Sequence, residues 1–188
     1  MFGRPLLVSL LGLLSWGFAY SPLELSTLAN LETPQKVRVQ GIYTADRETT
    51  ALIRGVVSSG TVTLPVEGTV FDWRPQSGTP VDLWGVLEER PSGPVLIFHN
   101  GRNPGDDRRP RPTPELAKGK TVAVWLQVTT GGTAPAPIMQ GVSEDRIAFL
   151  LPRYEGPTGL VCVTGDVTFL SVLGVQRPEL TNASVCSG

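Results

Sequence analysis

The chain has 188 residues and a formal net charge of −1, which argues against a surface built wholly for nucleic acid but allows a local basic patch. Its hydrophobic fraction of 40% is enough to bury one large core or two small ones. It contains 21 glycines and 17 prolines, and long helical patterns are scarce. These features predict an all-β protein with many turns.

Residues 1–19 have the composition of a signal peptide. Arg4 precedes an apolar stretch, and Gly17 and Ala19 supply the small residues of a cleavage site before Tyr20. The stretch is short for a membrane span, although an uncleaved N-terminal anchor is the alternative. No later stretch is long and apolar enough to cross a membrane. We therefore predict an exported bacterial envelope protein, periplasmic or extracellular.

Both cysteines, Cys162 and Cys186, follow the predicted signal peptide. An even count in an oxidising compartment favours one disulfide, which would tie a polar tail at residues 178–188 to the preceding fold. Two free thiols are the alternative. Neither cysteine has a CxxC partner, so we expect no redox or zinc role.

Residues 20–35 predict a short helix or a linker. Ser21 can cap a helix, Pro22 suits its first position and Glu24 can complete a capping box. Its apolar face would consist of Leu25, Leu28 and Leu31.

Alternating apolar residues predict a first barrel over residues 36–99. Val37, Val39 and Tyr43 share one face of its first strand. A later strand over residues 79–89 is interrupted by Gly85, and Trp84 points away from its apolar side. A central glycine is typical of a strand that bends sharply, and Gly41 and Gly165 lie at comparable places.

Residues 100–118 form an Arg- and Pro-rich stretch that we interpret as an exposed loop or linker. A single helical turn is predicted over residues 113–119. A second barrel is predicted over residues 119–177, where Val122, Val124, Leu126 and Val128 alternate with polar residues. Residues 167–175 are almost entirely apolar and predict a buried strand.

These patterns resemble the OB-fold, in which a long first strand with a central glycine precedes a hairpin, a Gly-x-x-Val-x-Leu-x-Gly-Val strand and a short last strand. The resemblance implies two small OB-like barrels in tandem, with a β-sandwich as the alternative. The helix usual between the third and fourth OB strands is missing or minimal in both halves. The matching segments are residues 37–43, 51–66, 78–87 and 95–98, and then 122–128, 138–151, 160–165 and 172–175.

Motifs of enzymes are mostly absent, and we predict a non-enzymatic protein without cofactors. The chain has one histidine, His99, and no GxSxG elbow. We interpret His99 as a structural or exposed residue. Asp106 and Asp107 are adjacent and do not form the spaced ligand set of a calcium loop, and we expect no metal site.

Two sets of residues are candidates for binding. Arginine forks suit phosphate or carboxylate, and tryptophans outside the core can stack on bases, as in OB-folds that bind single strands. One alternative is a solvated linker, and the other is tryptophans that cover the barrels or fill the contact between the two halves. The candidates are Trp84, Trp125, Tyr43, Arg102, Arg108, Arg109 and Arg111.

Two functions follow. The favoured one is an exported binding or adaptor protein of the envelope, whose barrels present edges or loops to a protein partner. It predicts an exposed apolar patch. The alternative is single-stranded nucleic-acid binding, which predicts Trp84, Trp125, Arg108 and Arg109 on one continuous face. An enzyme of unknown type is a distant third.

Overall fold

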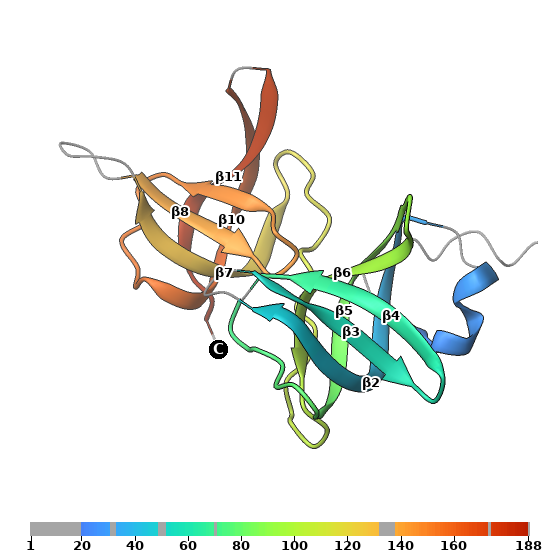
Figure 1. Cartoon of the computed structure of the whole chain (residues 1–188). Coiled ribbons are helices and arrows are strands. Elements are labelled where there is room, and N and C mark those ends of the chain that lie inside the picture. The colour runs from blue at the N-terminus through green and yellow to red at the C-terminus, as the bar shows by residue number, and fades with distance from the viewer. Residues whose placement is uncertain are drawn as a thin grey trace, which may run out of the picture.

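The computed structural model describes residues 20–30, 33–48, 52–69, 71–131, 138–172 and 174–187. Within them the chain forms two closed five-stranded β-barrels in tandem, which lie side by side in Figure 1. The predicted signal peptide and Leu31 lie outside the described residues. No helix in the described part has the length and apolar character needed to span a membrane.

Barrel 1 has the strand arrangement expected of an OB-like fold. Its first strand pairs with the second and the fourth, and the third pairs with the fifth in parallel. The barrel order is therefore β2-β3-β4-β6-β5, closing back on β2. The strands are β2 (Gln35–Glu48), β3 (Ile53–Ser59), β4 (Val62–Gly68), β5 (Pro80–Arg90) and β6 (Gly93–Arg102).

The core of barrel 1 contains the residues that the alternation selects, including Val37, Val39 and Leu83. Gly85 lies where the pairing of β5 with β6 shifts register, as expected of a bulge. A Cβ at Gly85 would overlap the carbonyl oxygen of Ile97, so only glycine allows β6 to approach this closely. A second register shift, between β10 and β11, lies at Gly165, as predicted, whereas the shift in β2 lies between Ala45 and Arg47 and not at Gly41.

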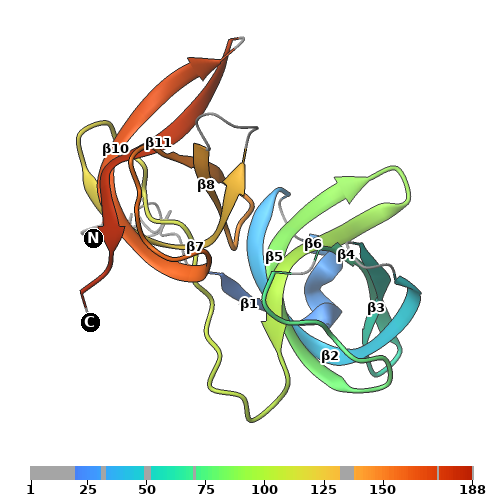
Figure 2. The same cartoon turned by 90° about the vertical axis from the view of Figure 1, so that its left-hand side faces the viewer.

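The segment before barrel 1 differs from the predicted helix. Residues Ser21–Leu23 form a short strand, β1, parallel to β2, and the helix begins later as a 3-10 helix, η1 (Leu25–Asn30). Leu25 is buried in the barrel core and Leu28 packs against it. Figure 2 looks along barrel 1 and shows η1 across its opening. This helix therefore covers one end of the barrel, and no helix forms in the described residues between β4 and β5.

Barrel 2 repeats the same topology with the order β7-β8-β9-β11-β10. Val124, Leu126 and Val128 face its core, as predicted. The strands are β7 (Thr121–Gly131), β8 (Ile138–Ser143), β9 (Ala148–Leu151), β10 (Gly159–Val172) and β11 (Val175–Val185).

Two predictions about barrel 2 are wrong. The polar tail at residues 178–188 is mostly strand β11, which places Leu180 in the core and pairs in parallel with β9. The apolar stretch over residues 167–175 is not one buried strand, because it contains the end of β10 and the start of β11. The second barrel therefore extends past residue 177.

The disulfide between Cys162 and Cys186 is confirmed. It links β10 to the residue just after β11, and the backbone N–H of Cys186 also donates to the carbonyl of Cys162, at 2.9 Å. The bond therefore fixes the end of the strand that closes barrel 2.

The β10–β11 hairpin extends beyond barrel 2, as the orange-red projection in Figure 1 shows. The pairing of β10 with β7 ends at Asp166, whereas β10 and β11 remain paired out to Val172 and Val175. We call residues 168–172 and 174–178 the arm. Within the described chain, no third strand pairs with the arm.

Candidate functional site

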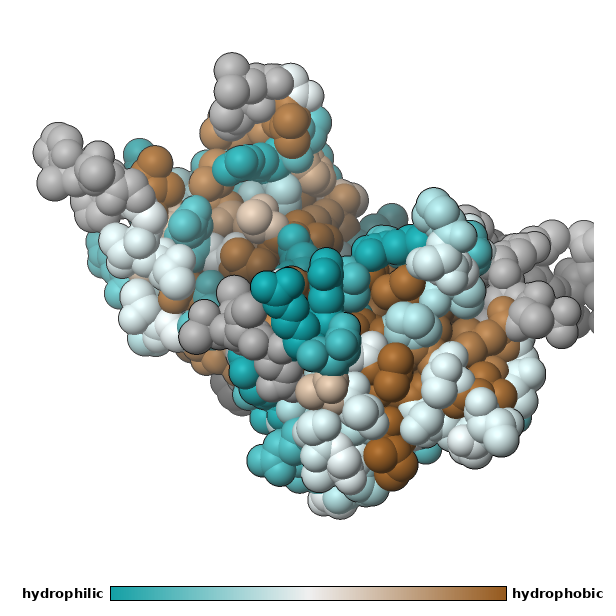
Figure 3. Space-filling model, viewed as in Figure 1, coloured by the Kyte–Doolittle hydropathy of each residue, from teal (hydrophilic) through white to brown (hydrophobic). Residues whose placement is uncertain are grey.

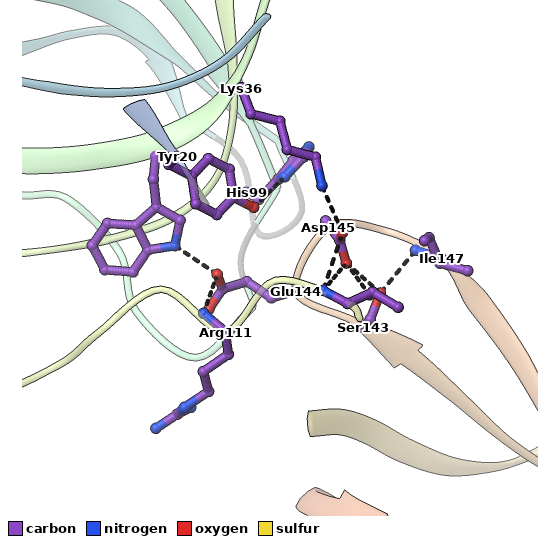
Figure 4. Close-up of polar contacts among 10 residues, drawn as sticks. Tyr20, Lys36, His99, Arg111, Ser143, Glu144, Asp145 and Ile147 are labelled. Carbon is purple, nitrogen blue, oxygen red and sulfur yellow. Dashed lines mark hydrogen bonds and ion pairs between the residues drawn. The ribbon is translucent and has the colours of Figure 1, made fainter. Parts of the chain in front are cut away.

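The two barrels meet at the turn between β8 and β9, which carries Glu144 and Asp145 (Figure 4). Glu144 is fully buried, with an exposed fraction of 0%. Its Oε1 accepts from Trp84 Nε1 at 2.6 Å and from the backbone N–H of Arg111 at 3.1 Å. Its Oε2 accepts from Asn100 Nδ2 at 3.1 Å. One carboxylate therefore joins barrel 2, barrel 1 and the linker.

Burial raises the pKa of Glu144, because a carboxylate loses hydration in the protein interior. The hydrogen bonds from Arg111, Asn100 and Trp84 act in the opposite direction. Because this side chain has no exposed surface, a substrate cannot reach it. We assign Glu144 the structural role of holding the two barrels together.

Asp145 anchors the other side of the same turn. It accepts hydrogen bonds from the hydroxyls of Thr113 and Ser143, and Lys36 Nζ of barrel 1 lies 3.4 Å from its Oδ2. Burial acts to raise its pKa, but these hydrogen bonds and the charge of Lys36 together lower the pKa of Asp145. Thr113 therefore lies in a buried loop contact, and the helical turn predicted over residues 113–119 does not form.

His99 is a buried structural residue beside the same turn. The Tyr20 hydroxyl lies within hydrogen-bond distance, 3.2 Å, of His99 Nδ1, and the Lys36 ammonium lies over the Tyr20 ring. Burial lowers the pKa of His99 to about 4. Burial also raises the pKa of the Tyr20 hydroxyl, and the charges of the neighbouring carboxylates add to this shift.

Two aromatic residues proposed for binding, Trp84 and Tyr43, are inaccessible, and the predicted shared face is wrong for Trp84. Trp84 has an exposed fraction of 0% and donates its indole N–H to Glu144. Tyr43 is buried in the core of barrel 1 and donates its hydroxyl to the carbonyl of Arg54. The alternative, in which Trp84 fills the contact between the two halves, is the one observed.

Three of the four candidate arginines are held by two aspartates of barrel 1, and Arg102 lies at the end of β6, so the exposed loop predicted from residue 100 begins only after it. Arg102 pairs with Asp82 at 2.9 Å. Arg108 and Arg111 pair with Asp72, at 2.5 and 3.2 Å. These pairs fasten the linker to barrel 1 and neutralise part of its positive charge.

Arg109 is the remaining loop arginine, and it is exposed. It makes no ion pair or hydrogen bond within the described residues.

Trp125 is the candidate tryptophan that reaches the surface, with an exposed fraction of 38%. The guanidinium of Arg111 lies over its ring, 4.5 Å from the centroid. Cys162 lies directly opposite Trp125 in the β7–β10 pairing. The fold thus brings two of the candidate residues, Trp125 and Arg111, together, but does not place Trp84 beside them.

The sequence prediction missed the exposed apolar residues of the arm. Phe169, Leu170 and Val175 have exposed fractions of 39%, 45% and 60%. In Figure 3, brown side chains are visible on the projecting arm. Gly174 and Pro178 were the available signals, because Gly174 marks a turn within the apolar stretch and Pro178, just after it, marks a strand edge.

Known proteins add little to this picture. No family model and no curated protein matches the chain. A solved structure described as "Molecular basis for abrogation of activation of pro-inflammatory cytokines" aligns with 84% of this chain and 98% of its own, at 10% identity and a TM-score of 0.28. At that score the likeness carries no argument about function. Among the described residues, no group of His, Cys, Asp and Glu side chains could hold a metal ion.

Proposed function

We propose that this protein is an exported, non-enzymatic adaptor that binds a protein partner through the arm at the end of β10 and β11. The observation that carries the proposal is the exposure of Phe169, Leu170 and Val175 on a hairpin that extends beyond its barrel. Exposed apolar residues grouped on one element are typical of interaction surfaces.

The backbone of the arm supports the same conclusion. A two-stranded hairpin is only marginally stable by itself, and its unpaired N–H and C=O groups can accept another strand. In the described structure, the backbone of Val167 still bonds to Lys120 and Gly119, and beyond Val167 β10 pairs only with β11. A partner that adds a strand to this edge would satisfy these backbone groups and cover the apolar side chains.

Export is supported by two independent features. The signal-peptide pattern of residues 1–19 predicts secretion. The bond between Cys162 and Cys186 is of a kind that forms and persists in oxidising compartments.

Binding of single-stranded nucleic acid has less support. The exposed Trp125 is partly covered by Arg111, and Trp84 is buried. Asp72 and Asp82 neutralise part of the charge of the loop arginines. A row of stacking aromatics over a basic groove, which such binding requires, is therefore not assembled in the described residues.

Site-specific photo-crosslinking in intact cells tests the adaptor proposal. A photoreactive amino acid at Leu170 should give one discrete protein adduct, whereas the same amino acid at Ser92, an exposed position in the turn between β5 and β6 of barrel 1, should not. The substitution Phe169→Ser should reduce the Leu170 adduct. Adducts of equal yield at both positions, or none at Leu170, would refute the assignment of the arm.

A further inference from the structure

A groove with both polar and apolar walls crosses barrel 1 on a surface that the adaptor proposal does not use. It consists of two adjoining hollows of about 520 and 570 Å³, which share Gln40 and Ser59 in their walls. The first hollow is bounded by β1, the start of η1 and the turn after β3. The second runs past the start of β5 to the beginning of the linker at Pro104 and Gly105.

Two arginines meet one carboxylate in this groove. Arg38 lines the first hollow and Arg102 the second, and both donate to the buried Asp82. Arg38 uses Nε, at 2.6 Å, and Nη2, and Arg102 uses Nε, at 2.9 Å. These hydrogen bonds lower the pKa of Asp82 against the effect of its burial, so it remains ionised. The cluster of three residues therefore carries one net positive charge.

Both guanidinium groups have N–H donors that Asp82 does not use. Within the described residues, Nη1 of Arg38 and Nη2 of Arg102 make no hydrogen bond. Asp82 fixes the orientation of both groups, so a ligand would meet two immobilised arginines. A planar guanidinium recognises a carboxylate through paired N–H groups, and fixing it in advance reduces the entropy lost on binding.

The remaining residues of the groove indicate what carries that carboxylate. Neither hollow is lined by an aromatic side chain on which a base could stack. Glu24 at the edge of the first hollow opposes a polyanion. The exposed Ile42, together with Pro80 and Pro104, adds apolar surface beside the arginines. A chain with one negative charge and apolar neighbours fits this surface.

We propose that this groove binds an extended peptide segment through one acidic side chain, held by Arg38 and Arg102 and flanked by Gln40 and Ser59. The site lies on barrel 1 and is separate from the arm of barrel 2. It gives the protein a second binding surface, with a different chemistry from the first.

NMR titration with a short blocked peptide, a central glutamate between valines, tests the proposal. The Nε–H signals of Arg38 and Arg102 and the side-chain amide of Gln40 should shift, and the same peptide with glutamine should bind about tenfold more weakly. Ser59→Glu adds a negative charge to the wall that the two hollows share, at an exposed residue that does not pair with Asp82, and should weaken binding by at least about tenfold. Ser92→Glu, its control in the exposed turn between β5 and β6 of barrel 1, should not.

The titration can also exclude an acidic peptide as the ligand of the groove. Equal binding of the glutamate and glutamine peptides, or no shift at the two arginines, would overturn the proposal. Displacement of the peptide by oligo(dT) or by oligogalacturonate at equal charge would overturn it too and assign the groove to a polyanion. Phe169→Ser should leave peptide binding unchanged. The proposal for the groove and the proposal for the arm are therefore tested independently.

Discussion

At the scale of single residues, His99 links the stability of the protein to pH. Burial lowers its pKa from 6.5 to about 4. Between pH 6.5 and pH 4, His99 is therefore protonated in the unfolded chain but neutral in the folded chain. Stability from this residue is complete above pH 6.5 and is lost as the pH falls toward 4. The loss amounts to about 3 kcal/mol.

His99→Gln tests this prediction, because glutamine can still hydrogen-bond with Tyr20 but does not titrate. Denaturant unfolding across this pH range should show a smaller decrease in unfolding free energy for the variant than for the wild type. The pKa values of Asp82 and Asp145 are lowered, so the stability that these two carboxylates contribute is lost only below pH 3.8, outside the range tested. Parallel profiles for the two proteins would contradict the assignment to His99.

The sequence could predict on which side of β5 the Trp84 side chain lies, but not which residues cover it. Alternation along β5 correctly places this residue outside the barrel core, and Val81 and Leu83 inside. Its partner, Glu144, is 60 residues away in the chain and belongs to the other barrel. The alternation of apolar and polar residues along one strand carries no information about a contact with the other barrel. It therefore cannot distinguish a tryptophan buried at the junction from one that binds a ligand.

At the scale of elements, the disulfide fastens the strand that completes barrel 2. Replacing both Cys162 and Cys186 by alanine should lower the free energy of unfolding by about 3 kcal/mol, because the bond closes a loop with a sequence separation of 24. Thermal or denaturant unfolding measures this loss. Wild-type protein kept under reducing conditions should match the variant, and a variant as stable as the oxidised wild type would contradict it.

Most strands could be predicted because their inward residues alternate with polar ones, as in β2 and β7. Strand β11 could not, since most of its residues are polar and only Pro178 and Leu180 are buried. The opposite error occurred in the arm, where apolar side chains suggested burial. Hydropathy indicates only that a side chain is more stable when buried. Whether the apolar side chains of the arm are covered depends on the neighbouring strand β7, whose pairing with β10 ends before the arm.

At the scale of the whole molecule, the two barrels should unfold as one unit because Glu144 joins them. Glu144→Ala removes the acceptor of three hydrogen bonds in the junction and should lower the free energy of unfolding by about 3 kcal/mol. Tryptophan fluorescence during denaturant unfolding provides the measurement, since Trp84 lies at the junction. Glu155→Ala, at an exposed glutamate, is the control and should change little. An equal effect of both substitutions would contradict the structural role of Glu144.

The linker between the barrels has consequences for how two ligands would be held. Arg102 holds the carbonyls of Asp106 and Arg108, Thr113 contacts Asp145, and Gly119 donates to Val167. A connection fastened at so many points does not behave as a loose tether. The groove and the arm therefore keep a set distance and direction, and a partner that engages both gains an effective concentration determined by rigid geometry. A partner of the wrong span would gain no avidity, so selectivity for partners would arise from spacing as well as from contact chemistry.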